Sequence, residues 1–475
     1  MRPRKIFFVI LAIAFWMLLT YIIVTKQTGQ NETKKIELLK QVELLEMEAH
    51  DTMEERKYIL EQVEKIIKMK DLGDISTVES ISSTTTVKKP VIYEDKQIQE
   101  RQENVEEKNV IDQPDDPEPL SEYQVTYLEN DRLRPVIPVV VFACNRPSVS
   151  RCLENLIRYR PNKEQFPIIV SQDCGDELTR DTILRYKAEV TLIEQPDDSV
   201  IQVPPKDKKF LGYYKIARHY GWALTQVFNK GFEFVIIVED DLNVSPDFYE
   251  YFHATFPLLR NDSSLWCVSA WNDNGKVGLI EEDRPDILYR TDFFPGLGWM
   301  LTRDLWNELQ PKWPKSFWDD WIRTPQNRKE RACIRPEISR TRTFGKVGVS
   351  NGLFFEKHLK YIKLSEDFVP FTKMNLTYLL KDNYDNQFLG RVYECPVITF
   401  EELRRGLAKN FNEVRIQYNT KEQYKRISKL LGLMDDFRSG VGRTAYRGIV
   451  SFFYNNQRVH LAPNRNWNGY DPAWS

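Results

Sequence analysis

The chain has almost no net charge, because its 67 lysines and arginines face 69 aspartates and glutamates over 475 residues. A nucleic-acid-binding protein needs a concentrated positive field to neutralise phosphates, and this composition shows no such field. We therefore expect no nucleic-acid partner. Aromatic residues are plentiful by contrast, with 11 Trp, 22 Tyr and 26 Phe, which suits both a sizeable core and surfaces that stack on sugars.

The apolar run near the N-terminus lacks the small residues at which a signal peptide is cut. Three basic residues within positions 1–5 precede an apolar run over residues 6–25, which as a helix spans roughly 28 Å, close to the thickness of a bilayer core. Its end offers no cleavage site, which disfavours a cleaved signal peptide. The preceding basic residues keep the N-terminus cytosolic. We predict a cytosolic tail, a type II signal anchor and a luminal remainder.

Four Asn-x-Ser/Thr sequons fit a luminal chain, although such triplets also occur often by chance. They begin at Asn31, Asn243, Asn261 and Asn375. Asn243 lies two residues beyond a run of acids that is discussed below. A glycan there would crowd any site, so we expect this asparagine to be unmodified.

Residues 26–131 lack the apolar content of a folded domain and are interpreted as a stem. Within it, residues 36–69 carry apolar side chains in an alternating four-three pattern that Thr52 and Arg56 interrupt. This pattern is typical of a broken coiled-coil seam, which leaves open self-association through the stem or a single solvated helix. Residues 73–131 have no apolar period and read as a flexible segment that cannot bury enough surface to fold.

The most informative stretch is Phe234–Val238, an unbroken apolar run that leads directly into Glu239, Asp240 and Asp241. A strand without alternation is typical of a parallel sheet buried on both faces. Open α/β sheets bind ligands at the carboxyl ends of their strands. Three adjacent acids repel one another, and a hard divalent cation relieves that repulsion. The alternative is a solvated acidic turn.

Strands alternate with helices on both sides of this stretch, which predicts βαβ units and a mostly parallel sheet. The expected strands are 136–143, 166–172, 190–193, 234–238 and 266–271, and the expected helices include 148–159 and 213–228.

Polar residues follow three of these strands, and parallel strands bring their carboxyl ends to one edge. Arg146, Asp173 and the acidic triplet should therefore converge, which favours a site over a chance acidic turn. Cys144 and Cys174 end neighbouring strands, which lie about 4.8 Å apart, within disulfide range. In an oxidising lumen we expect them to pair.

Three further features have two interpretations each. Asp319 and Asp320 stand between large aromatics, which would raise a carboxylate pKa and suit a general base, or they are solvated acids at a helix start. The glycine-rich residues 344–355 form a mobile lid or an ordinary surface loop. His219 borders the apolar face of its helix, where a histidine is more often a core residue than a ligand.

Four motifs are similar to the N-acetylglucosaminyltransferase I family, and the similarity runs from about Pro138 to Ser475. They are Val238–Leu242, Ser269–Gly275, Phe293–Trp299 and Phe317–Trp321. The resemblance implies a GT-A glycosyltransferase fold, an α/β protein with a Rossmann-like, mostly parallel sheet and a smaller C-terminal α+β domain. It also implies Mn²⁺, UDP-GlcNAc as donor and a high-mannose N-glycan as acceptor. The product would carry GlcNAc in β-1,2 linkage on the α-1,3-linked mannose, and the enzyme would lie in the Golgi membrane.

The resemblance also implies roles for single residues. Asp241 would bind the metal, Asp240 would face the ribose and Glu239 the donor sugar. Asp319 would be the catalytic base. The remaining assignments are Arg146, Asp173 and His219 against UDP, Trp318 against the donor sugar, Ser350 in a loop that orders over the donor, and a second disulfide between Cys267 and Cys333, with Cys152 and Cys395 left unpaired.

These observations divide the chain into an anchor, a stem and two luminal domains. We predict a tail at 1–5, a membrane span at 6–25, a stem at 26–131, a catalytic domain at 132–345, a lid and connector at 346–381 and a C-terminal domain at 382–475. One alternative function is a protein O-mannose β-1,2-GlcNAc-transferase, although its usual stem domain has no room here. An inactive luminal glycan-binding protein is disfavoured by the intact triplet and Asp319, and a phosphohydrolase by the lack of a second ligand set.

Overall fold

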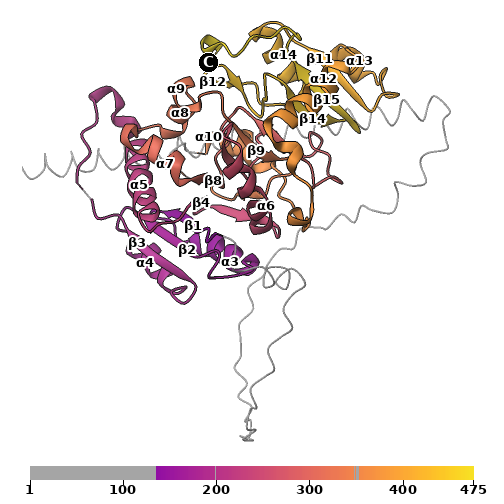
Figure 1. The fold of residues 1–475 in the computed structure, drawn as a ribbon. Coiled ribbons are helices and arrows are strands. Elements are labelled where there is room, and N and C mark those ends of the chain that lie inside the picture. Colours follow the sequence, from indigo (N-terminus) through magenta and orange to yellow (C-terminus); the bar gives the residue numbers. More distant parts are fainter. Residues whose placement is uncertain (1–134, 198, 347, 349–351, 475) are drawn as a thin grey trace, which may run out of the picture. The chain divides into compact units, whose positions relative to one another are not determined.

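The computed structural model describes residues 135–474 except 198, 347 and 349–351. These residues belong to one compact unit (Figure 1). No helix in this part of the chain is long and apolar enough to cross a bilayer. The predicted anchor and stem, and Ser350, lie outside the described residues.

An eight-stranded sheet forms the centre of the described chain, with the order β3-β2-β1-β4-β8-β6-β9-β7. The strands β3, β2, β1 and β4 run parallel, as does the pair β6–β9, whereas β8 and β7 pair antiparallel to their neighbours. The strands are β1 (Val139–Ala143), β2 (Ile168–Gln172), β3 (Val190–Glu194), β4 (Phe234–Glu239), β6 (Leu265–Ser269), β7 (Leu288–Thr291), β8 (Trp299–Thr302) and β9 (Ala332–Pro336). The mostly parallel α/β sheet expected from the sequence is present.

Helices cover both faces of this sheet, which explains why β4 is apolar without alternation. Ile236 and Val238 pack on one face with α3 (Val149–Tyr159) and α6 (Phe248–Asn261). Val235 and Ile237 pack on the other face with α5 (Leu211–Phe228) and α7 (Arg303–Leu309). Each such side chain contributes roughly 1.5–3 kcal/mol when it is fully buried. The remaining crossover helix of the parallel half is α4 (Glu177–Leu184).

A short two-stranded sheet follows the acidic triplet. Its strands are β5 (Leu242–Val244) and β10 (Thr341–Thr343), which pair antiparallel. This pairing returns a segment almost 100 residues away in sequence to the end of β4, so that residues 344 and 345 lie beside the triplet. The short helices near this region are α8 (Trp318–Ile322), α9 (Pro325–Arg328) and α10 (Leu353–Lys357).

The C-terminal elements from α13 onward gather largely around a core of their own (orange to yellow in Figure 1), whereas α11 and α12 pack into the core of the large sheet through Tyr384 and Val392. The strands β11, β15 and β14 form a three-stranded sheet, and β12 and β13 form a hairpin. The elements are α11 (Lys381–Tyr384), α12 (Gly390–Glu394), α13 (Phe400–Arg404), β11 (Glu413–Gln417), α14 (Lys421–Leu431), β12 (Phe437–Arg438), β13 (Val441–Gly442), β14 (Val450–Tyr454) and β15 (Gln457–Ala462). This mixture of strands and helices is what the sequence predicted for the region.

Both expected disulfides are confirmed. Cys144 and Cys174 follow the adjacent strands β1 and β2, with their Cα atoms 5.3 Å apart. Cys267 and Cys333 face one another in the parallel pair β6–β9, with a Cα separation of 4.6 Å. Cys152 and Cys395 are free thiols, as expected.

A buried ion pair joins the start of α6 to the segment that leads into β10. Arg340 and Asp247 are both fully buried, and an Arg340 Nη atom lies 3.0 Å from Asp247 Oδ2. Arg340 also donates to the carbonyl groups of Ile338 and Pro285, and Ser245 donates to Asp247. The pair is therefore fully hydrogen-bonded, which a buried charge requires.

Replacing Arg340 with leucine should lower the free energy of unfolding by roughly 3–5 kcal/mol, because Asp247 would keep its charge in a dry site without its partner. Denaturation by urea, followed by tryptophan fluorescence, measures this change. Arg404→Leu is the matched control, since Arg404 pairs with Glu401 at the surface and its loss should cost at most about 1 kcal/mol. Equally small shifts for the two variants would contradict the role assigned to the buried pair.

Candidate functional site

The carboxyl ends of β1 and β4 bring Arg146 to the acidic triplet. These strands are neighbours, and Phe142 of β1 lies opposite Glu239 of β4. The guanidinium of Arg146 contacts Asp241 Oδ2 at 2.5 Å and Asp240 Oδ1 at 3.4 Å. The convergence predicted from the strand ends is confirmed for these residues.

The three acids of the triplet have different surroundings. Glu239 accepts a hydrogen bond of 3.1 Å from the hydroxyl of Tyr220, on the α5 side of the sheet. Asp240 and Asp241 face Arg146 instead. Burial raises the pKa of Glu239 to about 8, and repulsion from Asp241 adds to the shift. Burial also raises the pKa of Asp240 to about 7, although Arg146 opposes this. The triplet therefore carries charge that the protein alone compensates incompletely.

Asp241 fits a metal ligand. Its Oδ1 atom is buried and has no hydrogen-bond partner among the described residues, although Arg146 contacts Oδ2. A buried carboxylate oxygen without a donor is costly, and a cation would satisfy it. Carboxylate oxygens are the ligand atoms that Mg²⁺ and Mn²⁺ prefer. The residues present therefore suit a hard divalent cation.

Gly345 allows the chain to pass directly over this cluster. The backbone N–H of Phe344 donates to the carbonyl of Asp241 at 2.8 Å, which fixes the approach. A Cβ atom at position 345 would collide with the Asp241 carboxylate and the Arg146 guanidinium. At Gly348 the nearest atom to such a Cβ is 3.9 Å away. The sequence identified a glycine-rich segment here but not which glycine the site requires.

His219 lies in α5 at the carboxyl end of β2. Its side chain is buried, with Nε2 2.8 Å from Ser171 Oγ and the ring edge-on to Phe142. Burial lowers its pKa to about 4, and the nearby charge of Asp173 opposes the shift. The imidazole is thus a hydrogen-bonded, neutral core group beside Asp173. Its contact with UDP stays a prediction, as does that of Asp173.

Asp319 is the second residue of α8 and follows Trp318, which belongs to a cluster of stacked aromatic side chains. Trp318 is buried and stacks on Tyr220 at a centroid distance of 4.6 Å. The Asp319 carboxylate points outward, with 44% of its side chain exposed, and Arg323 Nη1 holds its Oδ2 at 3.0 Å. Of the two interpretations that the sequence left open, the structure therefore matches a solvated acid at a helix start and not an acid enclosed by tryptophans. The helix turn buries Trp318 and leaves the next residue at the surface of the cavity.

A cavity of about 380 Å³ connects Glu239 with Asp319. Its walls come from the end of β4, from the glycine-bearing loop that precedes β8, from α8 and from the C-terminal elements. Glu239 lines this cavity and directly precedes the two acids that face Arg146, whereas Asp241 lies outside the cavity lining. A ligand that extends from the cavity to Asp241 would pass Glu239.

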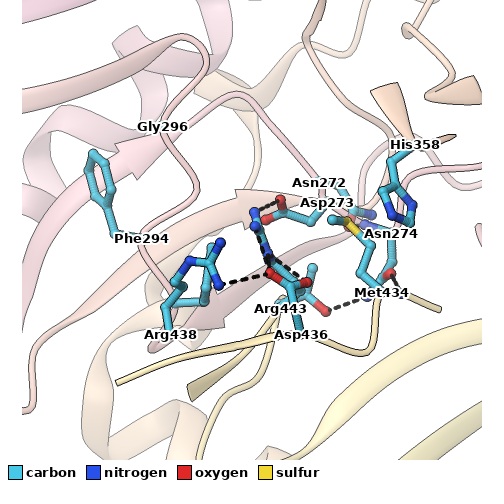
Figure 2. A network of polar contacts seen from close by, with 12 residues as sticks. Asn272, Asp273, Asn274, Phe294, Gly296, His358, Met434, Asp436, Arg438 and Arg443 are labelled. Carbon is cyan, nitrogen blue, oxygen red and sulfur yellow. Dashed lines mark hydrogen bonds and ion pairs between the residues drawn. The ribbon is translucent and has the colours of Figure 1, made fainter. Parts of the chain in front are cut away.

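Two arginines of the C-terminal elements form one wall of this cavity (Figure 2). Arg443 lies between Asp273 at 2.8 Å and Asp436 at 2.9 Å. Arg438 Nε contacts Asp320 Oδ1 at 3.0 Å. The sequence gave no signal for either arginine, because Arg443 is 170 positions from Asp273 and neither Arg438 nor Arg443 lies in one of the four motifs.

A family profile described as the GNT-I family matches residues 21–474. The chain belongs to the GNT-I family. The chain is also similar to the α-1,3-mannosyl-glycoprotein 2-β-N-acetylglucosaminyltransferase of Arabidopsis thaliana, with 40% identity over 331 residues. This match covers 69% of the chain and 74% of the Arabidopsis protein.

Two solved structures are similar over parts of the chain. A mannosyltransferase from Pyrobaculum calidifontis, solved with GDP-Man and Mn²⁺, matches with 17% identity and a TM-score of 0.26 over 39% of this chain and about half (52%) of that protein. A glucosyl-3-phosphoglycerate synthase from Mycobacterium tuberculosis, solved with Mg²⁺ and UDP, matches with 14% identity and a TM-score of 0.30, over 44% and 72% of the two chains. Matches with such low TM-scores support no conclusion about the function of this chain.

Gly345→Ala should weaken the binding of a divalent cation by roughly 10–100-fold, the usual effect of disturbing groups that hold a ligand in place. The new methyl group would push the Asp241 carboxylate and Arg146 apart. Isothermal titration calorimetry measures the affinity. Gly348→Ala is the matched control and should bind as the wild type does, since its methyl group meets nothing closer than 3.9 Å. Unchanged affinity in Gly345→Ala would remove the glycine from the site.

Proposed function

We propose that the chain is an inverting glycosyltransferase that moves GlcNAc from UDP-GlcNAc, in β-1,2 linkage, to the α-1,3-linked mannose of high-mannose N-glycans. This reaction would initiate hybrid and complex N-glycan synthesis. Membership of the GNT-I family and the name of the Arabidopsis relative support the reaction. The observation in the structure that carries the proposal is Asp241, whose buried, unpartnered oxygen stands beside Arg146 at the carboxyl edge of the sheet.

The donor lies across the carboxyl ends of β1, β2 and β4 in this proposal. Bound Mn²⁺, held by Asp241, supplies a Lewis acid for the departing diphosphate. Arg146 adds a fixed positive charge on the same side, and Asp240 faces the ribose. Glu239 is the only residue of the triplet in the cavity lining, which supports its assignment to the donor sugar. Trp318, which is buried and lines the cavity, closes it behind that sugar.

The acceptor hydroxyl enters from the side of Asp319. Inversion requires attack on the sugar face opposite the leaving group, so the base and the diphosphate site must lie on different sides of the donor. Asp319 lies in the cavity wall, away from the Arg146 cluster, and its carboxylate is accessible. It takes the proton from the acceptor hydroxyl, while Arg323 keeps the carboxylate in place. Arg438, Arg443 and Met434 line the same cavity and are available to contact the acceptor.

The cellular compartment of the reaction is proposed from the N-terminal sequence. The apolar run over residues 6–25 supports a single-pass type II anchor in the Golgi membrane, with the catalytic part luminal. The two disulfides of the described chain support an oxidising compartment. Self-association through residues 36–69 remains a prediction of the stem sequence.

Purified full-length chain in detergent should transfer GlcNAc from UDP-GlcNAc to a five-mannose N-glycan when Mn²⁺ is present, and transfer should stop with chelator. Mass spectrometry of the glycan measures the added sugar and its position. An O-mannosyl peptide in a parallel reaction should remain unmodified. Transfer to the peptide alone would support the O-mannose alternative, and binding of glycan without transfer would support an inactive lectin-like protein.

Asp319→Asn should lower kcat by roughly 10²–10⁴, because an amide cannot accept the proton of the acceptor hydroxyl. Asp320→Asn is the neighbouring control and should lose far less, since the Asp320 carboxylate already engages Arg323 and Arg438. Steady-state kinetics with UDP-GlcNAc and the five-mannose glycan measure both. A nearly normal kcat in Asp319→Asn would assign the base elsewhere.

A further inference from the structure

Three side chains with metal-binding atoms meet among the C-terminal elements, outside the cavity described above. Cys395 directly follows α12, Glu413 begins β11 and His460 lies within β15. In the parallel pair β11–β15, Glu413 faces Arg458, so His460 is its diagonal neighbour two residues further on the same face. An isolated bridge between Val397 and Arg415 brings the end of α12 to the same strand.

The ligand atoms are already spaced for a small cation. Glu413 Oε2 is 3.2 Å from His460 Nε2 and 3.9 Å from Cys395 Sγ, and all three atoms lie within 4.8 Å of one another. Tetrahedral Zn²⁺ with ordinary bond lengths places its sulfur, nitrogen and oxygen ligands roughly 3.3–3.6 Å apart. The two separations from Glu413 are therefore within a few tenths of an ångström of these values, and the remaining separation, between Cys395 Sγ and His460 Nε2, is at most 4.8 Å.

The histidine is held in the orientation that coordination needs. Its side chain is fully buried, and Nδ1 lies 2.8 Å from the hydroxyl of Ser451 on the adjacent strand β14. This contact occupies one ring nitrogen and directs Nε2 toward Glu413 and Cys395. Metal-bound histidines are oriented in this way by a partner on the other nitrogen.

The cluster is reachable from solvent. Cys395 and Glu413 line a shallow surface pocket together with Glu394 and Asn412. Arg391 Nε lies 3.4 Å from Glu413 Oε2 and competes for that oxygen, but 56% of the Arg391 side chain is exposed. Its long side chain can therefore turn into solvent when a cation enters.

We propose that Cys395, Glu413 and His460 form a second metal site that binds a zinc-class divalent cation, with its fourth position open to solvent. A thiolate and an imidazole select Zn²⁺ over Mn²⁺ or Mg²⁺, which prefer oxygen ligands. Binding releases the thiol proton to solvent. The imidazole moves its N–H from Nε2 to Nδ1, which then donates to Ser451 Oγ, so that Nε2 coordinates the cation in place of its hydrogen bond to Glu413. The cation ties the end of α12 to β11 and β15, so the site stabilises the C-terminal elements and is independent of sugar transfer.

Cobalt tests this proposal because its bond to a thiolate absorbs in the near ultraviolet, whereas cobalt at the carboxylates around Asp241 gives no such band. Full-length chain is stripped with chelator, without reductant, and titrated with Co²⁺. We expect a charge-transfer band that saturates at one cobalt per chain. Zn²⁺ should abolish the band, and excess Mn²⁺ should not.

Matched variants assign the band to this cluster. Cys395→Ser and Glu413→Gln should lose it or bind cobalt at least tenfold more weakly. Cys152→Ser, which changes the other free thiol, should keep the band, as should Asp241→Ala. Zn²⁺ should raise the melting temperature of the wild type but not of Cys395→Ser.

Three results would overturn the site: no band in the wild type, a band that survives in Cys395→Ser, or an equal Zn²⁺ effect on the melting temperature of both proteins. Circular dichroism checks that each variant is folded. Asp241→Ala should keep the cobalt band and lose GlcNAc transfer. The two readouts are therefore separate, and failure of the metal site is distinguishable from failure of the proposed reaction.

Discussion

The parallel register between β1 and β4 is the constraint on which the site depends. It sets Phe142 opposite Glu239, so the next residues of both strands leave the sheet at the same level and Arg146 reaches Asp240 and Asp241. A slip of one residue would turn every apolar side chain of β4 to the other face. Packed helices on both faces therefore fix the position of the carboxylates through the burial of valine and isoleucine.

Charge balance around the cavity follows from this arrangement. Arg146 faces the triplet and Arg323 faces Asp319, while Arg438 pairs with Asp320 and Arg443 pairs with Asp273. These pairs keep the carboxylates oriented, and removing one partner of a buried pair would leave an uncompensated charge. Two carboxylate oxygens of the cluster and cavity, Asp241 Oδ1 and Asp273 Oδ2, are buried without a hydrogen-bond partner among the described residues. Asp241 Oδ1 lies at the carboxyl edge of the sheet, where a bound cation could satisfy it.

The C-terminal elements have two roles that could not be predicted from their sequence. The β12–β13 hairpin carries Arg438 to Asp320 and places Arg443 beside Asp273, so it completes a wall that the main sheet cannot supply. Elsewhere, the β11–β15 pairing collects a thiol, a carboxylate and an imidazole. Both arrangements join side chains that are distant in the chain, since Asp273 and Arg443 are 170 positions apart and Glu413 and His460 are 47 apart.

Local patterns in the sequence determined the alternating strands and helices, the apolar strand that ends in three acids, and the approach of Arg146 and of Cys144 to their partners. Burial periodicity and the common edge of parallel strands require no knowledge of the rest of the fold. The tertiary structure alone decided that Asp319 is exposed and held by Arg323, that Gly345 passes over Asp241, and that Arg438 and Arg443 face the cavity. These features depend on contacts across 100 residues or more, or on the direction of one helix turn, and neither leaves a periodic trace in the chain.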